Sequence, residues 1–187
     1  MGHPLVVCRQ WNDSEQVQLA LTLPTSQGRQ RVAARFKHED LIRVSPAVEI
    51  RHCLAGLDTH AAQVLSELNS LLQKCGASVG VFGSLAWESI TGESYRHAAS
   101  DVDLICDVAS HLQLDACLNA LEEAASKLAF RLDGELRFPN GEAVAWRELA
   151  NHCNSPQAKI LVKGPVDVSL KPVSSLTEML IEEPANA

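Results

Sequence analysis

The sequence predicts an α+β protein in which a mixed-sheet domain with helices follows a small β-rich N-terminal domain. Three patterns along its 187 residues lead to this prediction. Residues 5–36 hold short segments in which apolar and polar side chains alternate, as they do in half-buried strands. From residue 58 onward, amphipathic helical stripes alternate with short apolar runs typical of buried strands. After residue 129, strand-like segments return, separated by turns rich in Gly and Pro.

We expect the β-rich domain to span residues 1–52 and the mixed-sheet domain to span residues 53–187. Three strands are expected in the first domain, at residues 4–9, 17–23 and 29–36. Ser45-Pro46 interrupts the regular pattern before the boundary, because the residue before a proline avoids helical geometry. About fifty residues bury too little apolar surface for an independent core, so we expect this domain to pack on the second.

In the second domain, helices and strands are expected to alternate. Asp58 or Thr59 is placed to cap a helix over residues 58–75, and Gly76 to end it. Further helices are predicted at residues 84–92, with Ser84 as its cap and Gly92 as its stop, at 112–128 and at 174–181. Strands are predicted at residues 78–83, 101–108, 129–138, 142–149, 159–163 and 166–170, with a hairpin turn at 139–141.

Composition and charge exclude several classes of protein. An apolar content of 46% is ordinary for a globular chain, and no run approaches the roughly 18–20 apolar residues of a membrane span. The first ten residues lack the layout of a signal peptide, so export is not expected. The six cysteines show no metal-site spacing, which favours free thiols in a reducing cytoplasm. The net charge of −7 argues against nucleic acid as a partner, as the missing span argues against a membrane.

The charge is unevenly distributed along the chain. Residues 29–51 carry six Lys or Arg against three acidic residues, whereas residues 52–187 carry nine basic and eighteen acidic residues. Such a segment is either a solvated strand face or a local patch for an anionic partner.

Asp101 and Asp103 open a predicted buried strand. Residues two apart in a strand point to the same face, so these carboxylates are expected to lie side by side while Val102 faces the opposite way. Two adjacent carboxylates repel each other, and a divalent cation relieves that repulsion. Mg²⁺ prefers hard oxygen ligands and is typically held by carboxylates together with substrate phosphates. The alternative is a solvated pair of acids at a strand end.

Gly83-Ser84 stands where a predicted strand turns into a helix. The free N–H groups of a first helical turn bind anions, and glycine lets a phosphate approach the backbone closely. The pair alone is also compatible with an ordinary helix cap. Neither a P-loop nor a G-x-S-x-G motif is present, which makes Ser84 a poor candidate for a hydrolase nucleophile.

A third carboxylate is available on the alternating strand that follows, as Asp133 or Glu135. Three carboxylates are able to hold two Mg²⁺ ions, which stabilise the attacking and leaving oxygens of a phosphoryl displacement. The combination with Gly83-Ser84 therefore favours a phosphate-and-magnesium site over the solvated alternative.

Gly83-Ser84, Asp101-x-Asp103 and a later strand carboxylate resemble the signature of the DNA polymerase β-like nucleotidyltransferase superfamily. A narrower resemblance covers most of residues 79–170, and more loosely the N-terminal strands. GSLAWESITG, SDVDLICDV, RLDGEL, GEAVAWREL and ILVK look like the phosphoribosyl-dephospho-coenzyme-A transferase of malonate decarboxylase, also called its holo-acyl-carrier-protein synthase.

The resemblance implies a reaction and its partners. Such an enzyme takes triphosphoribosyl-dephospho-coenzyme A and a serine of the acyl carrier protein subunit of malonate decarboxylase, forms a phosphodiester and releases diphosphate. The nucleophile then belongs to the partner, and the basic segment is a candidate surface for docking it. The runner-up functions are another minimal nucleotidyltransferase, which adenylylates a small molecule or protein, and a non-catalytic module that binds a nucleotide or a carrier.

The resemblance also assigns roles by position. Asp101 and Asp103 would bind Mg²⁺, and Gly83 and Ser84 would hold the triphosphate. The motif does not settle the third carboxylate, for which we favour Asp133 over Glu135. Two further groups are weaker candidates, because strand-end charges are often merely solvated and tryptophans are often packed in a core. These are Arg147 and Lys163 for the diphosphate, and Trp87 or Trp146 for stacking on the adenine.

Overall fold

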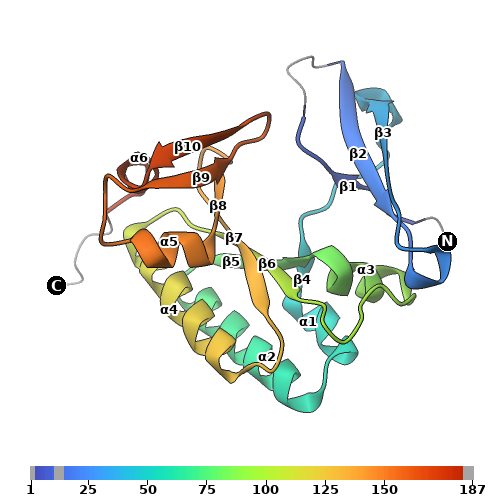
Figure 1. Cartoon of the computed structure of the whole chain (residues 1–187), viewed down its shortest axis with the longest axis horizontal. Coiled ribbons are helices and arrows are strands. Elements are labelled where there is room, and N and C mark those ends of the chain that lie inside the picture. The colour runs from blue at the N-terminus through green and yellow to red at the C-terminus, as the bar shows by residue number, and fades with distance from the viewer. Residues whose placement is uncertain (1–2, 11–14, 183–187) are drawn as a thin grey trace.

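The computed structural model describes residues 3–10 and 15–182, and its mixture of helices and two sheets confirms the predicted α+β class. The smaller sheet forms one arm of the molecule and the larger sheet, with its helices, forms the body (Figure 1). Within the described residues, no helix combines the length and the apolar character that crossing a bilayer requires.

The N-terminal sheet is antiparallel, in the order β1-β2-β3. Its strands are β1 (Val6–Val7), β2 (Gln16–Thr22) and β3 (Arg31–Lys37). Alternation in β2 buries Val17 and Leu19, whereas β3 is exposed along nearly its whole length. Backbone hydrogen bonds are among the contacts that tie this sheet to the body: Thr25 N–H donates to Ser94 O at 2.8 Å, and Gln10 N–H donates to Pro165 O at 2.9 Å.

The large sheet has the strand order β10-β9-β8-β7-β6-β5-β4. Its strands are β4 (Val48–Glu49), β5 (Ser78–Phe82), β6 (Val102–Asp107), β7 (Leu132–Arg137), β8 (Ala143–Ala145), β9 (Lys159–Lys163) and β10 (Val168–Pro172). β4 precedes the boundary expected near residue 52, yet it pairs with β5 of this sheet.

Helices α2 and α4 pack on each other and cover one face of the large sheet (Figure 1). The helices are α1 (Ile50–Cys53), α2 (Thr59–Lys74), α3 (Gly83–Thr91), α4 (His111–Lys127), α5 (Trp146–His152) and α6 (Ser174–Thr177). Of the two expected caps, Asp58 caps α2 by accepting the Ala61 N–H at 2.8 Å, and Thr59 is the first helical residue. Leu65 and Leu72 on its apolar side are fully buried, whereas Leu71 is 47% exposed.

β6 and β7 run parallel, and α4 provides the crossover between them. Their register pairs Asp103 with Asp133 and Leu104 with Gly134. Gly134 has φ +149°, and a Cβ placed there would lie 2.2 Å from the Leu104 carbonyl oxygen. The two strands therefore approach each other closely at a point that only glycine allows.

Several sequence predictions need correction. Residues 146–149, expected to continue a strand, begin α5, because Trp146 and Leu149 bury the same side of a helical turn. The hairpin partner of β7 is therefore limited to Ala143–Ala145. Ser84 does not cap α3, which already begins at Gly83 with Phe82 as its N-cap. The C-terminal helix is confined to Ser174–Thr177. The expected free state of all six cysteines is confirmed.

Candidate active site

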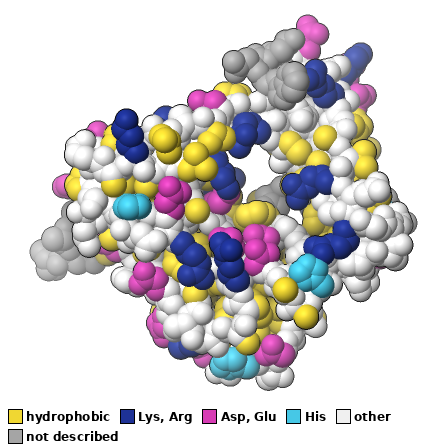
Figure 2. All heavy atoms as spheres, in the orientation of Figure 1, with side chains coloured by type: hydrophobic (Ala, Val, Ile, Leu, Met, Phe, Trp, Pro, Cys, Tyr) yellow, Lys and Arg dark blue, Asp and Glu magenta, His cyan; other side chains and the backbone are white. Residues whose placement is uncertain are grey.

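Three carboxylates meet at the ends of β6 and β7 where both strands begin. Asp101, Asp103 and Asp133 each offer an oxygen that lies within 4.8 Å of the others. Val102 and Leu104, which alternate with them, are 1% exposed and face the helices. The predicted arrangement of Asp101 beside Asp103 is thus present, on the sheet face that α2 and α4 leave open. Figure 2 shows acidic side chains gathered in the middle of this view, next to Lys and Arg side chains, below an opening between the N-terminal sheet and the body.

The carboxylates of Asp101, Asp103 and Asp133 repel one another. Partial burial, followed by repulsion from Asp101, Asp133 and Glu135, raises the pKa of Asp103 to about 6, and Arg131 offsets only part of the effect. Arg131 forms an ion pair with Asp133, with 3.0 Å between Nη2 and Oδ2. Clustered hard oxygen donors with excess negative charge are what a divalent cation such as Mg²⁺ requires, so these residues fit the metal that the sequence predicts.

Gly83 places the first turn of α3 directly against the carboxylates. Its φ is +69°, and a Cβ at this position would lie 2.2 Å from Asp103 Oδ2. The glycine is needed both for the left-handed backbone and for the close approach of Asp103. Ser84 follows in the same turn and is partly exposed. The predicted phosphate site and the predicted metal site are therefore adjacent.

Glu135 and Lys163 lie farther along the same open face and pair with each other. Lys163 Nζ is 2.5 Å from Glu135 Oε1, and the pair spans β8, which lies between their strands. The Lys163 side chain remains 42% exposed. Of the two candidates for the third carboxylate, Asp133 joins the aspartate pair, whereas Glu135 acts on it through its charge and holds Lys163.

Arg147 lies behind the start of β7. It donates from Nη2 to the Leu132 carbonyl oxygen at 3.0 Å, and its guanidinium stacks 4.2 Å above the Trp146 ring. Its buried Nε has no hydrogen-bond partner within the described residues. The arrangement places a cation one residue from Asp133, while Trp146 is occupied as its support.

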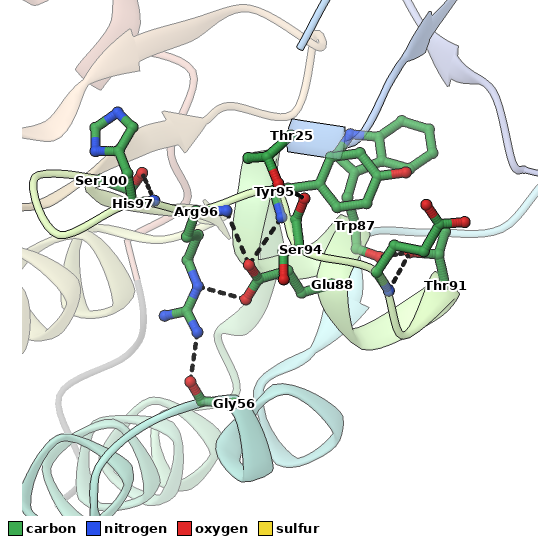
Figure 3. A network of polar contacts seen from close by, with 11 residues as sticks. Thr25, Gly56, Trp87, Glu88, Thr91, Ser94, Tyr95, Arg96, His97 and Ser100 are labelled. Carbon is green, nitrogen blue, oxygen red and sulfur yellow. Dashed lines mark hydrogen bonds and ion pairs between the residues drawn. The ribbon is translucent and has the colours of Figure 1, made fainter. Parts of the chain in front are cut away.

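Trp87 is not brought to the carboxylates. The residue is 7% exposed, and its ring stacks on that of Tyr95, with 5.9 Å between ring centroids. Figure 3 shows the two rings together beside the loop that follows α3. One face of the tryptophan predicted to bind adenine is thus covered by another ring.

Sequence reasoning missed Glu88 and Arg96, which form a polar network between α3 and the loop leading to Asp101 (Figure 3). Nothing in the periodicity pairs them, because the αL residue Gly92 reverses the chain between them. The only sequence feature that could have indicated this network is Glu88 itself, a charged residue on the otherwise mostly apolar helix α3.

Comparison with known proteins addresses the chain as a whole. The model of the phosphoribosyl-dephospho-CoA transferase MdcG C-terminal domain matches residues 49–174, and that of the N-terminal domain matches residues 1–47. No solved structure matches the chain.

Several relatives share the name phosphoribosyl-dephospho-CoA transferase. The protein of Xanthomonas campestris pv. campestris (strain 8004) is 34% identical over 177 residues, which cover 94% of this chain and 81% of the relative. That of Bradyrhizobium diazoefficiens is 30% identical, covering 82% of this chain and 66% of the relative. That of Pseudomonas fluorescens is 29% identical, covering 90% and 78%. The resemblance to this family is therefore confirmed, and the chain belongs to the phosphoribosyl-dephospho-CoA transferase family.

Proposed function

We propose that this protein transfers the phosphoribosyl-dephospho-CoA group from triphosphoribosyl-dephospho-CoA to a serine of the malonate decarboxylase acyl carrier protein, in a Mg²⁺-dependent reaction. The observation that carries the proposal is the contact of Gly83 with Asp103, which joins a phosphate-binding turn to a metal-binding carboxylate group. The printed name of the relatives supports the transferred group.

The bond changes of this reaction balance without a further reactant. The serine Oγ forms a bond to the phosphorus nearest the ribose, and the bond from that phosphorus to the next phosphate breaks. Diphosphate leaves with the electron pair, and the serine proton passes to a carboxylate oxygen of the cluster. The attacking group comes from the carrier, so the chain supplies position and charge.

Asp101, Asp103 and Asp133 would hold the metal. Bound Mg²⁺ supplies charge that stabilises the attacking and leaving oxygens of the displacement. Burial and, after it, repulsion from the neighbouring carboxylates raise the pKa of Asp103. The repulsion supports this role, because a cation would relieve it.

Gly83 and Ser84 would hold the triphosphate through the N–H groups of the first turn of α3, which runs for nine residues. Lys163 and Arg147 would neutralise the leaving diphosphate. Lys163 suits this role because its ammonium stays partly exposed on the open face while Glu135 fixes its place.

The test is a transfer assay in which the carrier is weighed by mass spectrometry. The protein, the carrier subunit, triphosphoribosyl-dephospho-CoA and Mg²⁺ are expected to give a carrier heavier by one phosphoribosyl-dephospho-CoA group. Asp101→Ala and Asp103→Ala should each abolish the gain, and EDTA should do the same. No gain with the unmodified protein, or a gain that persists in both variants, would refute the proposal.

A parallel reaction with ATP in place of the CoA precursor separates the main proposal from adenylylation. An adenylyl mass on the carrier, with none from the precursor, would identify a different nucleotidyltransferase. Binding of the carrier without any mass gain would identify a non-catalytic module.

A further inference from the structure

The Glu88 carboxylate joins two parts of the candidate site. Glu88 lies on α3, the helix that begins at Gly83. Its Oε1 accepts the backbone N–H groups of Tyr95 at 2.9 Å and Arg96 at 2.8 Å, and its Oε2 accepts Arg96 Nε at 2.6 Å (Figure 3). A single side chain therefore ties the helix of the phosphate turn to the loop that leads to Asp101.

Arg96 extends this network to a third segment. Its Nη2 donates to the carbonyl oxygen of Gly56, in the turn before α2. The side chains of Arg96 and Glu88 are only 22% and 19% exposed. Burial alone would raise the pKa of Glu88, but hydrogen bonds from the backbone of Arg96 and Tyr95 and from the Arg96 side chain hold it below its usual range. These hydrogen bonds therefore favour the ionised form of Glu88, in a pair that is largely shielded from water.

The segment between Arg96 and Asp101 forms a hydrogen-bonded turn. His97 N–H donates to Ser100 Oγ at 2.9 Å, and Ser100 N–H donates to the His97 carbonyl at 2.9 Å. These two bonds close the intervening residues into one turn, and Asp101 follows it directly. Because this turn connects the two residues, fixing the position of Arg96 limits the positions that Asp101 can take.

We propose that Glu88 and Arg96 are positioning residues that fix Asp101 beside Asp103 and thereby set the affinity of the site for a divalent cation, without touching it. The inference rests on the metal site of the proposed function. Residues that orient metal ligands from outside typically change metal affinity by about 10–100-fold when they are replaced.

The first measurement is a titration of the full chain with Mn²⁺, in which free Mn²⁺ is followed by electron paramagnetic resonance. Glu88→Gln and Arg96→Lys are each expected to raise the dissociation constant about tenfold. The double variant should be little worse than either single variant, because both substitutions disrupt the same hydrogen-bond network. Arg96→Lys keeps the positive charge, so it keeps the test open if Glu88→Gln fails to fold.

Glu142→Gln is the matched control. Glu142 pairs with Lys171 and its side chain is 14% exposed, but the pair joins β10 to the β7–β8 hairpin rather than to Asp101. It should lower the thermal midpoint to a similar extent and leave the Mn²⁺ dissociation constant within about twofold. An equal loss of Mn²⁺ affinity in Glu142→Gln would mean a general stability effect and would overturn the inference.

The second measurement needs no metal. In hydrogen–deuterium exchange, peptides covering residues 97–103 should exchange faster in Glu88→Gln than in the unmodified protein. In Glu142→Gln, the exchange rate of these peptides should equal that of the unmodified protein. Unchanged exchange and unchanged Mn²⁺ binding in Glu88→Gln would refute positioning while leaving the proposed function intact. A protein whose Mn²⁺ binding is absent, or is unaffected by Asp101→Asn, would refute the metal site and this inference with it.

Discussion

Gly83 meets two requirements at one residue: a left-handed backbone between β5 and α3, and space for the Asp103 carboxylate. Alanine at this position would have to accept φ +69° and a Cβ overlapping Asp103 Oδ2. We expect Gly83→Ala to lower transfer activity at least about 100-fold through displacement of Asp103, and to cost about 1–2 kcal/mol of stability. Steady-state transfer kinetics and thermal unfolding measure the two effects.

Gly92→Ala is the control for backbone strain. Gly92 has φ +74° at the other end of the same helix, but open space surrounds its Cβ position. It should show a similar loss of stability with nearly full activity. Equal activities of the two variants would contradict a specific role for the contact between Gly83 and Asp103.

Asp103 gives a pH dependence with a defined sign. Because its pKa rises from 3.8 to about 6 on folding, the metal-free folded state binds more protons than the unfolded state between these pH values. The free energy of unfolding should therefore fall as the pH rises through this window, by about 1 kcal/mol after solvent screening. Asp103→Asn should lose this pH dependence, be more stable than the unmodified protein at pH 7 in EDTA, and be inactive.

Urea unfolding at pH 4 and pH 7 in EDTA measures this effect. Asp115→Asn, which removes an exposed carboxylate on α4, should behave as the unmodified protein does. A larger stability of the metal-free protein at pH 7 than at pH 4, caused by Asp103, would contradict the raised pKa.

At the residue scale, strand alternation was sufficient to predict that Asp101 and Asp103 lie side by side, because Val102 must be buried. It could not predict that Trp87 stacks on Tyr95, since that contact depends on how the loop after α3 folds back. The network of Glu88 and Arg96 escaped prediction for the same reason. Local periodicity specifies the face of a residue, but not the partner that a loop brings to it.

At the element scale, strand β7 presents two carboxylates, Asp133 and Glu135, on the same open face. Asp133 lies with the aspartate pair, and Glu135 pairs with Lys163. Asp133→Asn should weaken Mn²⁺ binding at least about tenfold. Glu135→Gln should leave Mn²⁺ binding within about threefold, but raise KM for the triphosphate substrate about tenfold by releasing Lys163.

Metal titration and substrate kinetics on both variants distinguish these roles, with Lys163→Met as a companion that should reproduce the KM effect of Glu135→Gln. A stronger loss of metal binding in Glu135→Gln than in Asp133→Asn would reverse the assignment of the third ligand.

Prediction of the elements succeeded where a pattern ran long enough. The alternation in β2 and the apolar stripe of α2 each extend over several repeats of their period, so the predicted ends of both elements lie within one residue of the observed ends. α5 was missed because β8 contributes only three residues before Trp146 and Leu149 set a helical spacing. A short run of apolar residues does not distinguish strand from helix until its burial is known.

At the scale of the whole molecule, the N-terminal sheet forms an arm beside the body, next to the face of the large sheet that α2 and α4 leave open (Figure 1). Its edge strand β3 is exposed and carries Arg31 and Arg35 on one side. The basic segment predicted from the sequence thus reaches the surface, and we keep the hypothesis that it docks the carrier. Arg31→Glu with Arg35→Glu should raise KM for the carrier about tenfold at low salt and leave nucleotide binding within about twofold.

The matched control reverses two charges on the helical side of the large sheet, Lys74→Glu with Lys127→Glu, and should change neither constant. Equal losses for carrier and nucleotide in the β3 variant would remove the docking hypothesis. Kinetics at two salt concentrations separate steering from contact, because steering weakens with ionic strength.

The order of strands in the large sheet could not be predicted from the sequence. Each strand pattern specifies which face is buried, but not which neighbour completes the ladder. The close approach of β7 to β6 depends on Gly134, whose purpose is visible only once Leu104 lies beside it.

The parallel pairing of β6 with β7 also has a consequence for how the protein acquires its site during folding. Asp103 and Asp133 are cross-strand partners, yet the whole of α4 separates them in the chain. A parallel neighbour reached through a helical crossover is a nonlocal contact, and such contacts form late and slowly. A nascent chain in which β7 has not yet been synthesised therefore holds only two of the three carboxylates, Asp101 and Asp103. Tight cation binding would appear only when β7 docks on β6, so binding of the metal would report the formation of this parallel pair.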